Sequence, residues 1–440
     1  MSAAAPSILW FRRDLRLTDH PALAAAAADG PVVPVFVLDP ALSSLGARVD
    51  ALHACLRSLS SSMNGALVVR SGSPLTVLPA LVAETGARAV HVTDDFAPYG
   101  RRRDAAVEAA LDVPLVRTGT PYAVPPGAVL NGKDQPYQVF SAYCRAWRSR
   151  GWPAPVDPVD VRWVRDVAGE QVPGGALELS PEASLQRWRE FLDDSLSAYS
   201  TDRDRPDIDG TSRMSVALKF GLVHPRTLLA DLGRRARSEH ARKLGDELCW
   251  REFYADVLFH HPRSAWQDLR DSLGGMEYAD PSSPDVARRF AAWREGRTGF
   301  PIVDAGMRQL REEGWMHNRV RMITASFLVK DLHIWWPHGA RHFLDLLYDG
   351  DIASNNHGWQ WVAGTGTDAA PYFRVFNPTT QGRKFDPQGD YVRRYVPELR
   401  HLSGAAVHEP GDQRDYPEPI VDHAVERRVA LERYQAARAG

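Results

Sequence analysis

Short apolar runs alternate with Ala- and Leu-rich segments over the first third of the chain. The apolar runs are rich in Val and too short for helices, so they predict buried parallel strands, and the segments between them carry helix formers at helical spacing. Such alternation is typical of a doubly wound parallel sheet with helices on both faces, the α/β class. No Gly-x-Gly-x-x-Gly follows the first strand, which argues against a Rossmann dinucleotide site there. The predicted strands are Ile8–Phe11, Val32–Leu38, Ala66–Val69, Ala89–Val92 and Val113–Val116, and the predicted helices are Pro21–Ala28, Asp50–Ser62, Pro74–Thr85 and Arg101–Leu111.

The rest of the chain predicts a connector followed by an all-helical region. From Tyr122 to about Leu179 Pro and Gly are frequent, with one predicted helix at Gln138–Arg150, which favours a connector wrapped on the surface. After this segment strand signals nearly disappear. We therefore predict an α/β domain at 1–125, a connector at 126–180 and an all-α domain at 181–440. The helices predicted in the last part are Pro181–Asp194, His224–Glu239, Leu244–Phe259, Asp285–Arg294, Pro301–Glu313, His317–His333, Arg341–Leu347 and Val425–Arg438.

Composition and charge limit the class of protein. A chain of 440 residues is too long for one simple core, and a hydrophobic content of 44% with 25% charged residues is ordinary for a soluble globular protein. The net charge of −2 means that a nucleic-acid partner would need a local basic face. The N-terminus lacks a signal-peptide pattern, the apolar runs are too short for a membrane span, and three scattered cysteines show no metal-ligand spacing. We expect a cytoplasmic protein without a membrane partner or a metal site.

One stretch in the second half, residues 349–378, predicts a binding pocket. Its first part, residues 349–361, mixes two carboxylates, two adjacent amides and two tryptophans, and a run of small residues follows. Asn, Asp and Gly favour turns, so we expect irregular structure here rather than an ordinary helix or strand. Large indoles within such polar sequence favour the wall of a pocket for a flat molecule, whereas a buried loop whose tryptophans only fill the core is the alternative.

Two other segments place polar and aromatic side chains on one helical face. Glu247, Trp250, Arg251 and Tyr254 have the spacing i, i+3, i+4 and i+7, which suits a site that stacks a ring and bonds its edge. The alternative is an exposed ion-paired face. The second face comprises Trp315, Asn318, Arg319 and Met322, and the neighbouring His317 reads as a core histidine.

A third segment, 209–215, has the composition of a phosphate-binding start of a helix. Gly210 precedes small hydroxyl residues, whose N–H and O–H groups bind phosphate oxygens well. A Ser or Thr that merely caps the helix explains the same pattern.

These segments resemble the photolyase/cryptochrome family, most closely the bacterial class I cyclobutane pyrimidine dimer DNA photolyases (deoxyribodipyrimidine photolyases). The resemblance extends to Trp10–Leu23, Gly299–Leu310, Gly314–Leu332 and Asp415–Val421, and so to nearly the whole chain. It implies FAD held in the helical domain, which on illumination gives one electron to a pyrimidine dimer flipped out of UV-damaged single- or double-stranded DNA. The electron then returns, so no net redox change occurs. We expect a monomer.

The resemblance also implies roles for individual residues. Asn355 matches the residue that faces flavin N5, and Arg321 is the expected partner of Asp349. Arg203, Arg251, Arg319 and Arg374 match the DNA-facing rim. The other implied cofactor contacts are Tyr199, Thr211, Ser212, Arg213, Met214, Ser215, Gly350 and Asp351. The implied contacts to the dimer are Glu247 and Asn318 at its carbonyl edges, Trp250 and Trp361 as the two walls, and Met322.

Among the departures from the family pattern, two concern the supply of electrons and light to the flavin. The chain of three tryptophans that rereduces the flavin is matched by Trp359 and Trp336, whereas Tyr278 is the nearest aromatic residue to the outermost position. For the second, antenna chromophore, folate-binding members have an Asn-Glu pair where this chain has Tyr99-Gly100. A folate is therefore disfavoured, and a deazaflavin, another flavin or an empty pocket stay open.

Three functions other than repair of cyclobutane dimers are compatible with parts of the sequence. A cryptochrome-type blue-light signalling protein is the main alternative, but the dimer-contacting residue types are retained and the sequence stops soon after the last family motif. Repair of the 6–4 photoproduct uses a histidine pair in the pocket, where Asn318 and Met322 stand here. An unrelated electron-transfer flavoprotein explains the sheet but not the helical motifs.

Overall fold

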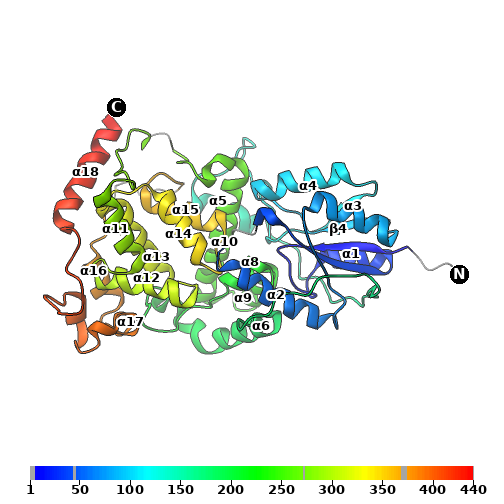
Figure 1. The fold of residues 1–440 in the computed structure, drawn as a ribbon, viewed down its shortest axis with the longest axis horizontal. Coiled ribbons are helices and arrows are strands. Elements are labelled where there is room, and N and C mark those ends of the chain that lie inside the picture. The colour runs from blue at the N-terminus through cyan, green and yellow to red at the C-terminus, as the bar shows by residue number, and fades with distance from the viewer. Residues whose placement is uncertain (1–4, 43–45, 271–272, 368–373, 440) are drawn as a thin grey trace. The chain divides into compact units, whose positions relative to one another are not determined.

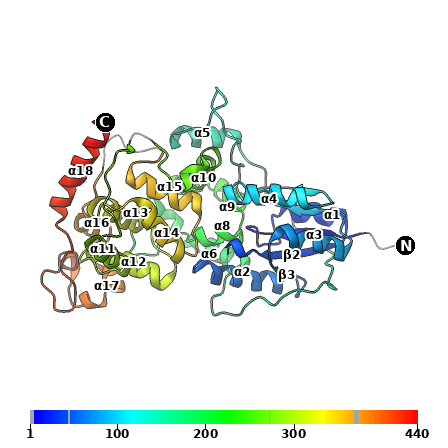
Figure 2. The same cartoon turned by 45° about the horizontal axis from the view of Figure 1, so that its top comes forward.

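The computed structural model describes residues 5–42, 46–270, 273–367 and 374–439, and the chain divides into two compact units (Figures 1 and 2). The first unit comprises Met1–Tyr137, Ser141–Asp193 and Ser212–Pro262. The second comprises Gln138–Phe140, Asp194–Thr211 and Arg263–Gly440. Each unit is therefore assembled from separate stretches of sequence. The domain boundaries at 125 and 180 stay a prediction.

The first unit contains a parallel sheet of five strands in the order β3-β2-β1-β4-β5. Ser7 pairs with Val32 and Ile8 with Val90, so β1 lies between β2 and β4. All five residues of β1 and nearly all of β2 are buried, as expected for a parallel sheet covered on both faces. The predicted sheet is confirmed. The strands are β1 (Ser7–Phe11), β2 (Val32–Leu38), β3 (Val68–Ser71), β4 (Val90–Val92) and β5 (Leu115–Arg117).

The helices between the strands cover the two faces of the sheet. Figure 1 shows α3 and α4 on one side of the strands and α2 on the other. Proline occupies the first turn of α1, α3 and α4, where its missing N–H costs nothing. Ser73 caps the start of α3, and Gly86, with φ of 63°, ends it. These helices are α1 (Pro21–Asp29), α2 (Arg48–Ser62), α3 (Pro74–Thr85) and α4 (Pro98–Ala110).

The first unit also contains the helix that carries the Glu247 face. This helix, α10, starts at Glu239 behind the N-cap Ser238 and ends at His260. The single helix predicted at His224–Glu239 is wrong, because α9 stops at Gly233 and a turn separates it from α10. The remaining helices of this unit are α5 (Phe140–Arg150), α6 (Pro181–Glu190), α8 (Ser215–Phe220) and α9 (Pro225–Gly233).

Two buried carboxylates fasten the segment after β5 to α10. Glu252 accepts hydrogen bonds from the N–H of Val124 at 3.0 Å and from Nε1 of Trp147 at 2.6 Å. Asp256, one turn later, accepts from the N–H of Gly127 at 2.7 Å. Burial raises the pKa of Glu252 to about 7 although these donors favour the anion. The orientation of α10 is thus fixed by polar bonds as well as by packing.

The second unit is helical in its described part and has a core rich in aromatic side chains. Trp293, Trp336 and Trp359 lie in this core, with Phe327 and Phe343. The predicted helical class is confirmed. Its helices are α7 (Tyr199–Asp202), α11 (Pro284–Glu295), α12 (Pro301–Glu313), α13 (Asn318–Ser326), α14 (Trp336–Leu346), α15 (Ile352–Ala363), α16 (Pro378–Phe385), α17 (Asp390–Tyr395) and α18 (His423–Ala439).

The prediction of irregular structure after residue 349 is wrong for residues 352–363, which form α15. The Asp351 carboxylate accepts the N–H groups of Ala353 and Ser354 at 3.1 Å, which satisfies donors that every helix start leaves open. Gly364, with φ of 90°, ends the helix. Caps at both ends therefore compensate for the weak helix propensity of the residues between them.

Two further helix boundaries differ from the predictions. The helix predicted at Arg341–Leu347 starts at Trp336, because Pro337 fits its first turn. The helix predicted at His317–His333 ends as an α-helix at Ser326 and continues as a π-helical turn, Phe327–Asp331. His333, with φ of 56°, follows this turn.

Two of the sequence motifs behind the family resemblance are joined to each other by buried hydrogen bonds. The buried carboxylate of Asp304 accepts the N–H and the Oγ1 hydroxyl of Thr298 at 2.7 and 2.6 Å. It also accepts the phenolic hydroxyl of Tyr416 at 2.5 Å. The Gly299–Leu310 motif and the Asp415–Val421 motif therefore meet at one side chain of α12.

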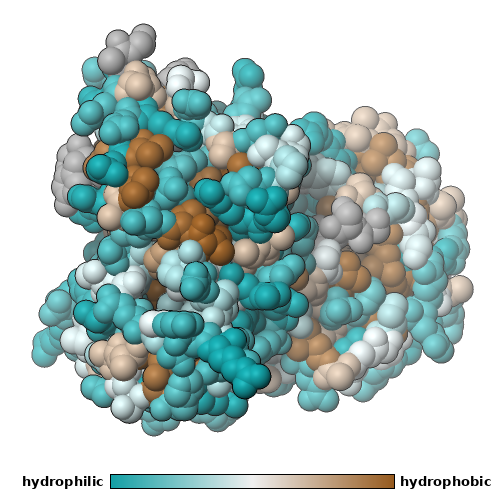
Figure 3. Space-filling view, turned by 60° about the vertical axis from the view of Figure 1, so that its left-hand side comes forward, coloured by the Kyte–Doolittle hydropathy of each residue, from teal (hydrophilic) through white to brown (hydrophobic). Residues whose placement is uncertain are grey.

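The surface is mixed in polarity. Figure 3 shows hydrophobic side chains in separate groups on a mainly hydrophilic face. In the described ranges, no helix combines the length and the apolar character that a membrane crossing requires.

Candidate functional site

The predicted face of α10 is present in the first unit. Glu247, Trp250, Arg251 and Tyr254 are all partly exposed, whereas the residues between them are buried. The Trp250 and Tyr254 rings lie 5.3 Å apart. The shared face inferred from the spacing is thus confirmed, while its role in binding stays a prediction.

Arg251 on this face holds neighbouring backbone. Its guanidinium donates to the carbonyl oxygens of Pro121 and Leu218 at 3.2 Å, and its central carbon lies 4.7 Å from the centre of the Tyr122 ring. These contacts fix Arg251 beside Trp250, so at least two of its donors are used inside the unit.

Arg321 and Asp349 form the ion pair that the sequence predicts. Two guanidinium nitrogens of Arg321 donate to the two carboxylate oxygens of Asp349 at 3.1 and 2.8 Å, and Nε donates to the carbonyl of Met316 at 2.8 Å. Such a two-pronged pair is rigid, and it compensates the charge of Asp349, whose side chain is 3% exposed. The following Gly350 and Asp351 lead into α15, which Asp351 caps.

Asn355 has a defined orientation on α15. Its Nδ2 donates to the carbonyl oxygen of Ala340 at 3.1 Å and to Oδ1 of Asn356 at 2.8 Å. Asn356 in turn donates its own amide N–H to the carbonyl of Ala265. Because a backbone carbonyl can only accept, the nitrogen of Asn355 must face Ala340. Its amide oxygen is therefore turned to the other side, where it can accept a hydrogen bond.

The candidate phosphate segment lies at the start of α8. Met214, rather than a Ser or Thr, occupies the cap position, so side-chain capping does not account for the hydroxyl residues. Arg213 has a left-handed backbone, with φ of 53°. Ser212 and Ser215 flank these residues in the first unit. Tyr199 and Thr211 belong to the second unit.

The second predicted face, at the start of α13, is also partly exposed. Asn318 is exposed, and Arg319 and Met322 are half-buried. Arg319 forms an ion pair with Asp204 at 2.9 Å, and its guanidinium lies 4.5 Å from the Phe385 ring centre. A DNA phosphate at the predicted contact would therefore compete with Asp204 for the guanidinium of Arg319.

The other predicted residues of this region have structural neighbours of their own. His317 accepts the N–H of Arg319 at 3.2 Å as the N-cap of α13, in agreement with its interpretation as a core histidine. The Arg203 guanidinium lies 5.8 Å from the Tyr199 ring centre. Trp361 is half-buried on α15, and Arg374 is exposed.

An aromatic series runs outward from the core of the second unit. Trp336 and Trp359 are buried members of this core, and Trp335 and Tyr278 pack against it with partial exposure. The Trp335 ring lies 6.3 Å from that of Trp336 and 6.4 Å from that of Tyr278. Sequence reasoning does not select Trp335, although an adjacent Trp-Trp pair at a predicted relay residue is a usable signal.

At the carboxyl ends of β1 and β4 the strand order reverses, which is where such sheets bind ligands. Polar side chains near this position bond to one another. Tyr99 donates its hydroxyl to Asp39, and Arg103 bridges Asp95 at 3.3 Å and Asp104 at 2.7 Å. The identity of an antenna chromophore stays a prediction.

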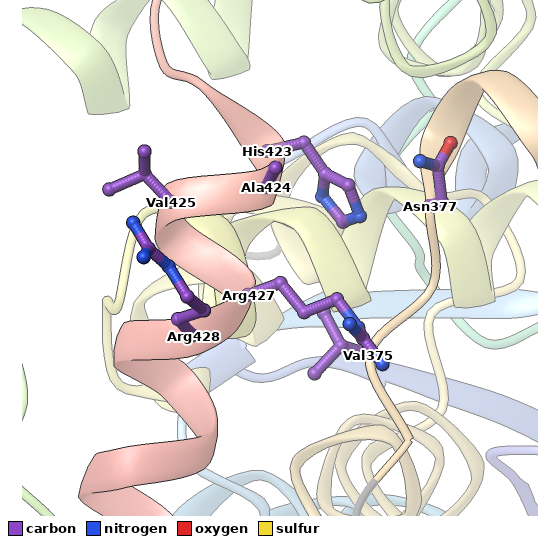
Figure 4. A pocket seen from close by; sticks show the side chains of 7 residues that line it. All are labelled: Val375, Asn377, His423, Ala424, Val425, Arg427 and Arg428. Atoms are coloured by element: carbon purple, nitrogen blue, oxygen red, sulfur yellow. The ribbon is translucent and has the colours of Figure 1, made fainter.

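A surface cavity of about 530 Å³ lies between α18 and the residues before α16. Figure 4 shows His423 and Arg427 directed toward Val375 and Asn377. Two of its polar side chains already serve the fold, since His423 bonds Asp331 at 2.5 Å and Asn377 caps α16. None of the predicted site residues lines it, so we place no function there. The lining residues are Val375, Asn377, His423, Ala424, Val425, Arg427 and Arg428.

The fold and these groups define the class of protein. A parallel α/β unit is combined with a helical unit that presents a neutralised carboxylate, an oriented amide and a series of indoles. This combination is typical of a protein that binds a flat nucleotide cofactor and moves single electrons.

The particular family follows from comparison with known proteins. Residues 7–160 match the family described as DNA photolyase, and residues 244–436 match the FAD binding domain of DNA photolyase. The deoxyribodipyrimidine photo-lyase of Escherichia coli is 37% identical over 492 residues, which cover 98% of this chain and 99% of that protein. The chain therefore belongs to the DNA photolyase family, and FAD is confirmed as its cofactor.

Solved structures support the same assignment. A bacterial class III photolyase from Agrobacterium tumefaciens superposes with a TM-score of 0.92 at 36% identity, covering 100% of this chain and 99% of that chain. An archaeal photolyase from Sulfolobus tokodaii, described with two FAD molecules, gives a TM-score of 0.83 at 25% identity and covers 98% of this chain and 100% of that chain.

Proposed function

We propose that this protein is a light-driven DNA repair enzyme that splits cyclobutane pyrimidine dimers. The observation that carries the proposal is the fixed amide of Asn355, whose nitrogen is held by Ala340 and Asn356. Its oxygen can accept a hydrogen bond from a reduced flavin without adding a negative charge. A neutral acceptor favours the anionic reduced cofactor that repair requires, since a like charge would oppose it.

The chain offers groups whose chemistry suits FAD. When bound and reduced, FAD supplies the absorption of light and the transferable electron. Asn355 would orient the flavin ring, and Arg321 cancels the charge of Asp349, so that this carboxylate does not repel an anion. The residues proposed to hold the phosphates and ribose are Tyr199, Thr211, Ser212, Arg213, Met214 and Ser215, with Gly350 and Asp351 beside the flavin.

The substrate residues are proposed on the two partly exposed helical faces. Glu247 and Asn318 would bond the carbonyl edges of the dimer, where negative charge develops after electron arrival. Trp250 and Trp361 would stack on the extruded bases. Met322 would be a further contact to the dimer. Aromatic stacking contributes roughly 1–3 kcal/mol per base, enough to retain an extruded lesion.

Phosphate contacts are proposed for the rim arginines. Arg203, Arg251, Arg319 and Arg374 would position DNA without reading its sequence. For the antenna, the Sulfolobus tokodaii photolyase with two FAD molecules favours a second flavin over a folate.

The test of this function is repair in light compared with darkness. The purified protein should show flavin absorption, and illumination should remove dimers from UV-treated oligo(dT), whereas the dark sample should not. Glu247→Ala should retain the flavin but lose most repair. Flavin-loaded wild-type protein that leaves dimers intact under illumination would contradict repair and favour the cryptochrome alternative.

A further inference from the structure

The outward aromatic series of the second unit includes Trp335, which does not match any of the three relay tryptophans of the family. Trp336 is fully buried, whereas Trp335 and Tyr278 are partly exposed. The Trp335 ring lies between them, 6.3 Å from Trp336 and 6.4 Å from Tyr278 by ring centres. Among the ring contacts described, that of Tyr278 is to Trp335. Trp335 therefore links the rings of Trp336 and Tyr278 through contacts on both sides.

The backbone holds Tyr278 at this end of the series. The N–H of the next residue, Ala279, donates to the carbonyl of His333 at 2.8 Å. His333 precedes Trp335 by two residues, so the loop that carries Tyr278 is tied to the segment that carries Trp335. The contact between the two rings is thus built into the chain and does not depend on side-chain packing alone.

A second set of rings, among the residues that the structure describes, touches Trp359 but leads to poorer electron donors. Trp359 lies 4.9 Å from the Phe343 ring and 6.1 Å from the Trp293 ring. The next rings from Trp293 are those of Phe290 and His342. A phenyl ring and a neutral imidazole are much harder to oxidise than an indole or a phenol. An oxidised Trp359 is therefore better refilled from Trp336, a buried indole of the same core cluster.

The carboxylate of Asp268 accepts a hydrogen bond from each of the adjacent indoles, Trp335 and Trp336. Oδ1 of Asp268 accepts the Nε1–H of Trp336 at 2.6 Å and that of Trp335 at 3.4 Å. Oxidation of an indole makes its N–H strongly acidic, and a nearby carboxylate stabilises the positive charge and can take the proton. Burial and the charge of Asp268 also raise the pKa of Tyr278, so its phenol stays protonated until it is oxidised.

We propose that Trp335 is the electron relay between Trp336 and Tyr278, with Asp268 as the shared proton acceptor. The inference rests on the proposed function only in that Trp359 must lose an electron to the photoexcited flavin. One electron then moves from Trp336 to Trp359, from Trp335 to Trp336 and from Tyr278 to Trp335. When Trp336 or Trp335 is oxidised, it lends its Nε1–H proton to Asp268 and recovers the proton when it is refilled; Trp359 keeps its proton. Tyr278 releases its phenolic proton to solvent, and an external thiol returns one electron and one proton to it. Two thiyl radicals then couple to a disulfide.

The test compares Trp335→Phe with Trp266→Phe under flash illumination. Trp266 also packs on this core with partial exposure and is not part of the series, so it is the matched control. The readouts are the identity of the protein radical by electron paramagnetic resonance and the rate of flavin photoreduction with a thiol present. We expect a tyrosyl radical in the wild type and in Trp266→Phe. In Trp335→Phe we expect tryptophanyl radicals alone and photoreduction about tenfold slower, a barrier increase of about 1.4 kcal/mol.

Two further variants separate the parts of the proposal. Tyr278→Phe should lose the tyrosyl radical but still form a radical on Trp335, and Asp268→Asn should lengthen the lifetime of the protonated indole radical. A tyrosyl radical that survives in Trp335→Phe, or one that disappears in Trp266→Phe, would overturn the relay.

Repair with chemically reduced flavin is the check that keeps the two proposals apart. Trp335→Phe should repair dimers at the wild-type rate once dithionite has reduced the cofactor. If no variant repairs dimers but the radicals behave as described, the proposed function fails and the relay stands. If repair is normal but the radicals are unchanged in Trp335→Phe, the relay fails and the function stands.

Discussion

At the scale of single residues, short chains of hydrogen bonds fix the orientation of amide and carboxylate side chains in this protein. Asn355 is the clearest case, because Asn356 is itself held by the carbonyl of Ala265. The orientation of one amide therefore depends on a backbone group about ninety residues away in sequence. Satisfied polar networks of this kind specify one arrangement, since any member left unpaired in a buried site is costly.

Replacing Asn355 by Asp should weaken the reduced state of the flavin. The carboxylate cannot donate to Ala340 or Asn356, and its charge opposes the anionic cofactor. We expect the flavin reduction potential to fall by about 60 mV or more for a one-electron step, equivalent to about 1.4 kcal/mol. Redox titration measures this, and Asn355→Ala separates the loss of the amide from the added charge. Equal potentials in wild type and Asn355→Asp would contradict the role.

The rim arginines should differ in their contribution to DNA binding. Arg374→Gln should lower the slope of log K against log salt by about 0.9 on duplex DNA, the value for one phosphate contact. Arg319→Gln should lower it less, because Asp204 already pairs with Arg319. Binding titrations over a series of salt concentrations measure the slope, with Arg288→Gln on α11 as the control. An unchanged slope in Arg374→Gln would remove it from the rim.

At the scale of elements, the caps decide where α15 lies. The Asp351 carboxylate bonds two N–H groups at the start and Gly364 closes the end. Between them the helix brings Asn355, Trp359 and Trp361 onto one rigid support. A site built on a helix holds its groups more firmly than one built on a loop.

Removing the cap should destabilise the helix. Asp351→Ala should lower the free energy of unfolding by about 1 kcal/mol, the usual cost of losing an N-cap. Asp351→Ser should recover most of this loss, because a hydroxyl can accept the same N–H groups. Urea denaturation of the three proteins provides the measurement. A stability unchanged in Asp351→Ala would show that the cap bonds contribute little.

The sequence was sufficient for the strands, most helices and the two polar faces, because hydrophobic spacing reports on which side of an element is buried. It was not sufficient for α15, where turn-forming residues sit inside a helix fixed by its ends. It also misplaced the boundary between α9 and α10, since the turn at residues 234–238 contains no Gly or Pro to mark it. Trp335 was missed for another reason: the adjacent Trp-Trp pair is visible in the sequence, but the contacts of Trp335 to Tyr278 and Asp268 join segments far apart in sequence, which residue order does not report.

At the scale of the whole molecule, buried ionisable groups make stability depend on pH in opposite directions. Glu252 has a raised pKa of about 7 in the folded state, so it favours folding at lower pH. His224 behaves in the opposite way. Its burial, followed by the charges of Arg16 and Arg226, holds its pKa well below the ordinary value of 6.5. Its contribution is present above pH 6.5 and is lost as the pH falls.

His224→Gln should therefore remove one acid-sensitive component. Gln can still donate to the carbonyl of Thr120, which His224 contacts through Nε2 at 2.8 Å. Below pH 6.5 the wild type should lose up to about 1.4 kcal/mol per pH unit relative to His224→Gln. Urea denaturation at several pH values measures this difference, with the exposed His401→Gln as the control. A constant difference between wild type and His224→Gln at all pH values would exclude His224 as the cause.

The division of the chain into interleaved stretches has a consequence for how such a protein can be cut and recombined. A gene fragment encoding residues 181–440 would contain α8, α9 and α10 but not residues 121–127, whose backbone groups bond Arg251, Glu252 and Asp256. The buried acids of that fragment would be left facing water or empty space. Chimaeras between relatives should therefore tolerate crossovers that keep both stretches from one parent, and should misfold when a single breakpoint separates them.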